Sequence, residues 1–293
     1  MNQPANRLTR HAAFVLLCGV GLAFFYYPGV QLLRMSFHSE LYSHIPLIPL
    51  ISLCILIFSR NRIFSETRWG WAGSALLALG LGMLLSGNWI TGLKQHDYLS
   101  MVMSGAVLWF IGSFVLAYGG KSFKEAMFPL LFLVFVIPIP TFILDPFVDL
   151  LLIGSAYSTE LIYNLTGVPV HRDGFTFALP GITIEVAREC SGIRSSIALI
   201  ITSVCAGYLF LNKGWARVVL VLSFFPITVF KNALRIVTLS LLASYVDTRF
   251  ITGSWLHKSG GIPFFAVGLA LMAPVLWALM KAEKRNQRKS RQD

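Results

Sequence analysis

The sequence contains few charged residues. Asp, Glu, Lys and Arg make up 13% of its 293 residues, about half the share that is usual in a soluble globular domain. Hydrophobic residues make up 56%, and the mean hydropathy is +0.70. This composition excludes an ordinary soluble domain. It predicts an all-α polytopic membrane protein, because long apolar segments satisfy their backbone polar groups in lipid as helices.

Negative charge is scarcer than positive charge, with 13 acidic residues against 24 Lys and Arg and a net charge of +11. In a soluble chain this excess would indicate nucleic-acid binding. Here the cations lie in short segments between apolar runs and in the basic tail 281–293, which is typical of membrane topology signals. We therefore expect a lipid bilayer around the chain and no nucleic-acid partner.

Cysteine is also rare, and the four cysteines lack the spacing of a metal site. Cys18, Cys54 and Cys205 lie within apolar runs, where cysteine behaves as a small hydrophobic residue. We expect no disulfide, no metal and no cofactor. Cys190 differs from the others because polar residues lie on both sides of it.

The apolar runs predict about eight transmembrane helices within a single domain that covers residues 1–293. The first run lacks an Ala-x-Ala cleavage site, so we expect it to be retained as a span. The predicted spans cover residues 13–33, 44–58, 69–86, 101–118, 123–140, 191–211, 217–243 and 260–280.

The distribution of Lys and Arg predicts the orientation of these spans. With the N-terminus inside, the inner segments carry 15 of these residues, the outer segments carry seven, and Lys231 and Arg235 lie inside a span. The excess of positive charge on the inner side predicts that both termini are cytoplasmic.

Residues 141–190 form a predicted extracytoplasmic excursion between spans five and six. In its first half, polar residues including Asp145, Asp149 and Glu160 recur at near-helical spacing, which favours an amphipathic helix on the outer surface. Its second half alternates and contains Asp173-Gly174 and Pro180-Gly181, which predicts a small β-hairpin.

Three chemically capable residues fall at the predicted outer face. Cys190 is a candidate nucleophile, because a helix N-terminus and nearby cations lower the pKa of a thiol. His257 is a candidate general acid and base. Arg235 would be a fixed cation for a thiolate or an oxyanion.

Four further residues are candidates to support this site. Asn232 precedes Arg235 by one helical turn, Gly192 permits close backbone approach, Ser191 is a candidate helix cap, and Glu189 would hold Arg235 or His257 in place. Structural interpretations also exist for a cysteine at a helix end, for an arginine that reaches the lipid phosphates and for a solvated loop histidine. The case for a catalytic site depends on the three groups occurring together.

The chain resembles the exosortases in three motifs and in their order. These are Cys190-Ser191-Gly192-Ile193, then 230–236 (FKNALRI), and then His257 before Gly260-Gly261. Archaeosortases share the same Cys, Arg and His pattern. The resemblance covers about residues 130–270 and includes Pro138-Ile139-Pro140.

This resemblance implies a multi-pass enzyme of the bacterial inner membrane, in the form that has no fused accessory domain. It would be a cysteine protease and transpeptidase that cleaves PEP-CTERM sorting signals of exported proteins at the periplasmic face. Cys190 would form a thioester, His257 would be the general acid and base, and Arg235 the stabilising cation. Two alternatives remain open at this point: a cysteine-dependent membrane acyltransferase, and a transporter with an anion path lined by Arg and Lys.

Overall fold

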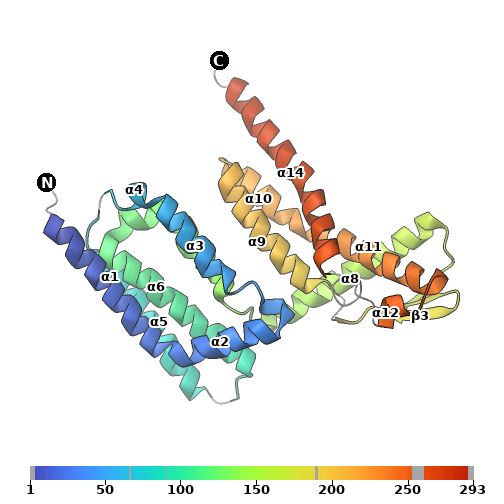
Figure 1. Ribbon diagram of the computed structural model, residues 1–293, viewed down its shortest axis with the longest axis horizontal. Helices are drawn as coiled ribbons and strands as arrows, with labels where there is room; N and C mark the ends of the chain where they lie inside the picture. Colours follow the sequence, from blue (N-terminus) through green and yellow to red (C-terminus); the bar gives the residue numbers. More distant parts are fainter. Residues whose placement is uncertain (1–3, 66, 91, 189–190, 253–260, 290–293) are drawn as a thin grey trace. The chain divides into compact units, whose positions relative to one another are not determined.

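The computed structural model describes residues 4–65, 67–90, 92–188, 191–252 and 261–289, and its elements are predominantly helical (Figure 1). Among these residues, six helices are long and apolar enough to cross a membrane, and three shorter helices are also apolar. The prediction of an all-α polytopic membrane protein with a small β-structure is confirmed. By its internal contacts the chain divides into two compact units, Met1–Leu144 and Asp145–Asp293.

The first unit consists of helices that are joined by short turns. Its elements are α1 (Pro4–Phe24), α2 (Tyr26–His38), η1 (Glu40–Tyr42), α3 (Leu47–Phe58), α4 (Arg60–Ile63), α5 (Ala72–Trp89), α6 (Gln95–Glu125), α7 (Met127–Phe132) and η2 (Leu133–Val136). Its core contains Phe114, Tyr118 and Leu130, all nearly inaccessible to solvent.

Helices α5 and α6 pack side by side with almost no room between their backbones (Figure 1). A Cβ atom on Gly80 would lie 2.6 Å from the carbonyl oxygen of Gly105, and one on Gly112 would lie 2.9 Å from that of Gly73. Small residues at facing positions let two membrane helices approach closely, so these glycines determine the packing of the pair.

The second unit contains most of α8 (Thr141–Thr166), a small sheet, and a group of apolar helices. The helices are α9 (Ile193–Phe210), α10 (Gly214–Leu222), α11 (Phe224–Tyr245), α12 (Arg249–Thr252) and α14 (Gly261–Lys289). Leu199, Leu220 and Met272 form a core that joins α9, α10 and α14.

The sheet has three antiparallel strands, β1 (His171–Asp173), β2 (Thr176–Leu179) and β3 (Ile182–Glu185), in the order β1-β2-β3. Gly174 and Gly181 have φ angles of 59° and 81° and turn the chain between the strands. Phe177 packs with Tyr163 of α8 and Val237 of α11. The predicted turns are confirmed, and the hairpin has one more strand than expected.

The helices differ from the predicted spans mainly at their breaks. The predicted span 13–33 is divided at Phe25 into α1 and α2, and 217–243 is divided at Ser223 into α10 and α11. The spans 44–58, 69–86 and 123–140 correspond to the shorter apolar helices Leu47–Phe58, Ala72–Gly87 and Met127–Val136. Such breaks are poorly visible in a hydropathy pattern, because a short non-helical step leaves the surrounding run apolar.

Helix α8 was predicted as a surface helix and forms one continuous helix of 26 residues that meets the length and composition of a span. It begins directly after Pro138-Ile139-Pro140, where Asp97 of α6 accepts hydrogen bonds from the backbone N–H and the hydroxyl of Thr141 at 2.8 and 2.7 Å. The position of α8 on the outer surface stays a prediction, as do the count of eight spans and the single domain.

Candidate active site

The structure describes some residues of the three sequence motifs and leaves others out. Glu189, Cys190 and His257 lie outside the described residues, so their predicted roles stay predictions. Ser191, Gly192, Asn232 and Arg235 are described. The geometry of the candidate site therefore comes from the start of α9 and from the middle of α11.

Gly192 is the N-cap residue of α9 and adopts the left-handed conformation, with φ 77° and ψ 13°. A Cβ atom at this position would lie 2.9 Å from the side-chain oxygen of Asn232. Glycine is the residue that occupies both this conformation and this space at little cost. The backbone of Gly192 thus lies close to the side chain of Asn232, and the supporting role of Gly192 in a catalytic site stays a prediction.

Ser191 was expected to cap α9, and this prediction is wrong. Gly192 takes the N-cap position, and no side-chain hydrogen bond caps the helix. The hydroxyl of Ser191 is buried and has no hydrogen-bond partner among the described residues. Its backbone N–H donates to the carbonyl of Arg188 at 3.1 Å.

Asn232 joins α11 to α8. Its side chain is fully buried, and its amide nitrogen donates a hydrogen bond to the hydroxyl of Ser155 at 3.0 Å. One residue earlier on α8, a Cβ atom on Gly154 would lie 3.0 Å from a methyl group of Val229. The two helices are therefore close enough for these short polar side chains to bond directly.

Lys231 joins α11 to α9. It is 1% exposed, and its amino group donates a hydrogen bond to the hydroxyl of Ser195. That hydroxyl in turn donates to the carbonyl of Gly192 at 2.9 Å. The aliphatic part of Lys231 lies next to Gly268 of α14, whose absent side chain leaves room for it. A polar connection thus runs from the arginine-bearing helix to the cap of α9.

The sequence places Lys231 within an apolar run, but it did not predict Ser195 as the partner of Lys231 or Ser155 as the partner of Asn232. The available signal was that Ser195 belongs to the same polar segment as Cys190, 189–196. The pairing itself depends on how α9, α11 and α8 are rotated about their axes, and hydropathy does not specify this.

Arg235 lies one turn after Asn232 on α11, and its side chain is half-buried. Arg235 follows Asn232 by three residues and Lys231 by four, and both separations place two side chains on neighbouring parts of one helix face. Because α11 is continuous from Phe224 to Tyr245, Asn232 and Arg235 lie on one helix face, as the sequence predicts.

The segment that leads into the cysteine motif is bound to α8 by charge. Arg188 forms ion pairs with Asp145 and Asp149, both with N–O distances of 3.0 Å. Arg172 of β1 forms a second pair with Glu160, at 2.6 Å, and lies over the ring of Tyr157 at 4.3 Å. The acidic residues of α8, which the sequence predicts on the polar face of an amphipathic helix, are thus the partners of an arginine in β1 and of an arginine that follows β3.

The described residues contain no group of three or more His, Cys, Asp or Glu side chains that could hold a metal ion. The polar cluster instead consists of hydroxyl, amide and cationic groups on α8, α9 and α11. This fold and this site define a class of protein: a polytopic helical membrane protein with buried polar side chains at the start of α9. Ionisable groups within spans usually serve function.

A comparison with protein-family models identifies the particular family. The model described as Transmembrane exosortase (Exosortase_EpsH) matches residues 34–274. The chain therefore belongs to the transmembrane exosortase family, which confirms the resemblance seen in the three motifs. Neither the curated proteins nor the solved structures gave a match.

Membership in this family establishes a multi-pass membrane protein with a transpeptidase role in protein sorting. The match spans both compact units and includes all three motifs.

Proposed function

We propose that this protein cleaves C-terminal sorting signals of exported proteins through a thioester on Cys190. The observation that carries the proposal is the attachment of the cysteine motif to the arginine motif. Gly192 lies against Asn232, and Ser195 accepts a hydrogen bond from Lys231, so the first turn of α9 is held to α11 at two points. Cys190 precedes Gly192 by two residues, and Arg235 follows Asn232 by three.

In the proposed reaction, the thiolate of Cys190 attacks the carbonyl carbon of the scissile peptide bond, and a C–S bond forms. Arg235, assisted by Asn232, stabilises the oxyanion that develops. When this intermediate collapses, the C–N bond breaks and the imidazolium of His257 protonates the leaving amine. An amine or a water molecule then attacks the thioester, loses a proton to His257 and releases the thiolate.

The substrates would be exported proteins with a PEP-CTERM type signal, and the site would lie at the periplasmic face of the bacterial inner membrane with both termini in the cytoplasm. The positive charges of the predicted inner segments support this orientation. The family match supports a substrate that carries a sorting signal.

The test is co-expression with a tagged substrate that ends in such a signal. Cys190→Ala and Cys190→Ser are expected to accumulate in the membrane at the wild-type level and to leave the substrate uncleaved. Arg235→Lys keeps the charge and loses the planar fork, so processing should fall by at least about tenfold, about 1.4 kcal/mol of transition-state stabilisation. Full processing by Cys190→Ala would contradict the proposal.

The mass of the trapped enzyme adduct distinguishes the peptide reaction from the alternative of a lipid acyltransferase. His257→Ala should slow release of the amine, so that the acyl-enzyme or the uncleaved substrate accumulates. An adduct with the mass of a substrate fragment supports the proposal. An adduct with the mass of a fatty acyl chain supports the acyltransferase instead.

A further inference from the structure

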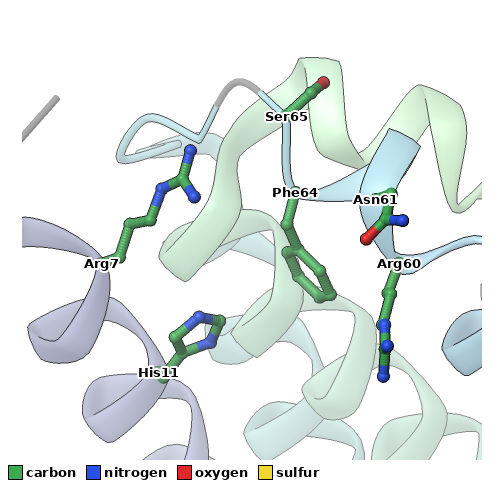
Figure 2. A pocket seen from close by; sticks show the side chains of 6 residues that line it. All are labelled: Arg7, His11, Arg60, Asn61, Phe64 and Ser65. Atoms are coloured by element: carbon green, nitrogen blue, oxygen red, sulfur yellow. The ribbon is translucent and has the colours of Figure 1, made fainter. Parts of the chain in front are cut away.

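The first unit contains a cavity of about 470 Å³ at one end of its helices (Figure 2). Arg7 and His11 of α1 line one part of it, and Arg60 and Asn61 of α4 line another. Phe64 and Ser65 complete the described lining, with the ring of Phe64 between the two sets of side chains in this view. The volume lies in the range of small-molecule sites, roughly 300–1,000 Å³.

The lining favours an anion. It presents two guanidinium groups, one imidazole, one amide and one hydroxyl, and none of its described residues carries a carboxylate. Arginine donates two parallel hydrogen bonds to a phosphate or a carboxylate. The amide of Asn61 is a further donor, whereas the Ser65 hydroxyl donates to the carbonyl of Arg62 at 2.9 Å.

The imidazole of His11 is held in place before any ligand binds. Its Nδ1 atom is hydrogen-bonded to the hydroxyl of Tyr118 at 2.8 Å, and Tyr118 is itself 3% exposed. The His11 ring also contacts Phe64 edge-on, with the ring centroids 5.7 Å apart. The Nε2 atom remains as the group that can donate to an anion. The contacts of the ring with Tyr118 and Phe64 fix its orientation, which lowers the cost of binding.

A neighbouring arginine shows the contrast. Arg62 lies two residues after Arg60 and is already paired with Glu125, with an N–O distance of 2.7 Å. It does not line the cavity. The structure thus has one arginine of α4 in the cavity and one outside it, which supplies a matched control.

The surroundings of the cavity favour a lipid as the source of the anion. Leu8 follows Arg7 directly and is 73% exposed, and Phe58 near Arg60 is 91% exposed. Trp71, in the segment after Ser65, is also largely exposed. Exposed apolar side chains and tryptophan beside basic residues are typical of the boundary between the acyl chains and the headgroups.

We propose that this cavity binds the phosphate of an anionic phospholipid headgroup. Arg7 and Arg60 bind the phosphate oxygens, His11 donates from Nε2, and the acyl chains lie over the apolar residues next to the cavity. The site lies entirely in the first unit and is independent of the proposed peptidase reaction, so each is tested separately.

The test uses the full-length chain purified in a neutral detergent, with binding followed by native mass spectrometry. The lipid probe is phosphatidylglycerol, the free-anion probe is glycerol phosphate, and diacylglycerol is the control without phosphate. The variants are Arg7→Gln and Arg60→Gln, compared with Arg62→Gln, which removes an equal charge outside the cavity. Asn61→Asp places a carboxylate in the lining and should repel either anion.

We expect phosphatidylglycerol to bind the wild type and Arg62→Gln alike, and Arg7→Gln and Arg60→Gln about tenfold more weakly, a difference of about 1.4 kcal/mol each. Binding of glycerol phosphate with this same ranking, and no binding of the lipid, would support the phosphate site and assign it to a free anion. Three results would overturn the proposal: no binding of either probe, equal binding of diacylglycerol, or binding by Arg60→Gln and Asn61→Asp as in the wild type.

Discussion

Lys231 of α11 donates a hydrogen bond to Ser195 of α9, and the lysine side chain is buried while the serine is half-buried. Because the same serine hydroxyl donates to the carbonyl of Gly192, the lysine acts on the backbone at the start of α9. The bond connects a buried cation to the segment that contains the candidate nucleophile. Both of its partners can be changed independently.

Removal of the serine hydroxyl should cost more stability than removal of the lysine. Ser195→Ala leaves the Lys231 amino group buried without this acceptor, and the expected loss is about 1–3 kcal/mol. Lys231→Met replaces the buried polar group by an apolar chain of similar length, and such exchanges are often neutral or stabilising. Unfolding of the purified variants in detergent, followed by circular dichroism, measures both.

Thr202→Ala is the control for this comparison, because among the described residues the Thr202 hydroxyl bonds within α9, to the carbonyl of Ala198 at 2.7 Å. The double variant Ser195→Ala/Lys231→Met should recover most of the stability that Ser195→Ala loses. A double variant that is no more stable than Ser195→Ala would show that the bond does not stabilise the fold.

Gly192→Ala should destabilise the start of α9 for two reasons. An alanine in the left-handed conformation costs about 1–2 kcal/mol, and its Cβ atom would lie 2.9 Å from Asn232. Gly174→Ala is the matched control, because Gly174 also has a positive φ, 59°, and nothing lies within 4 Å of its added Cβ atom. We expect substrate processing to fall for Gly192→Ala and to remain near wild type for Gly174→Ala. Equal activity of the two variants would show that the contact with Asn232 is unimportant.

The ion pairs of Arg188 should influence activity more than stability. Arg188, Asp145 and Asp149 are each about half exposed, so each pair contributes about 0–1 kcal/mol. Arg188→Gln would loosen the segment directly before the cysteine motif and is expected to lower processing by up to about fivefold. Added salt should reduce the wild-type activity toward that of the variant, since it screens exposed pairs.

Arg249→Gln is the control for the Arg188 experiment, because it removes the same charge from a largely exposed side chain whose distance to Asp247 is 3.9 Å. If Arg249→Gln lowered processing as much as Arg188→Gln does, a general charge effect would explain the result.

The sequence predicts the helical class, the β-turns and the membership of the family because each depends on local signals. Apolar runs specify helices in lipid, and Gly174 and Gly181 stand where only glycine turns easily. The breaks at Phe25 and Ser223 were not predicted, because both residues lie inside apolar runs and hydropathy does not register Pro28 and Pro226, which lie in the first turn of α2 and of α11 and lack the N–H of a continuous helix.

The sequence predicted which residues belong to the candidate site but not which of them contact one another. Its cysteine, arginine and histidine are visible because polar groups stand out against apolar runs. The bonds of Lys231 to Ser195 and of Asn232 to Ser155 depend on the relative rotation of three helices. Serines in apolar helices are common, so Ser155 carries no signal until these helices are placed together, and Ser195 carries only that of its polar segment 189–196.

Stability of the first unit should decrease as the pH falls through the range in which His44 titrates. His44 lies in the turn before α3, and its burial lowers the pKa of its imidazole below the usual 6.5, against the smaller effect of hydrogen bonds with the backbone of Leu41 and Phe135. The neutral form is therefore favoured in the folded state. Its contribution is complete above pH 6.5 and is lost as the pH falls toward the lowered pKa.

The midpoints of thermal unfolding at pH 7.5 and pH 5.0 measure this effect. The decrease between them should be smaller for His44→Gln than for the wild type. His38→Gln is the control, because its exposed ring bonds only to the carbonyl of Arg34 among the described residues. An equal decrease in the wild type and in His44→Gln would exclude His44 as a source of acid sensitivity.

The packing of α5 against α6 predicts opposite effects for two glycines that are two residues apart. Gly80→Ala would place a Cβ atom 2.6 Å from the carbonyl oxygen of Gly105, and because that oxygen belongs to a helix backbone, the two helices would have to separate. Gly82→Ala meets nothing within 4 Å and replaces a flexible residue by a good helix former, worth about 0.5–1 kcal/mol. Unfolding midpoints should therefore fall for Gly80→Ala and rise or remain unchanged for Gly82→Ala. Equal midpoints for the two variants would mean that the helices are not in contact at Gly80 in the membrane protein, since the same chemical change would then have met the same surroundings.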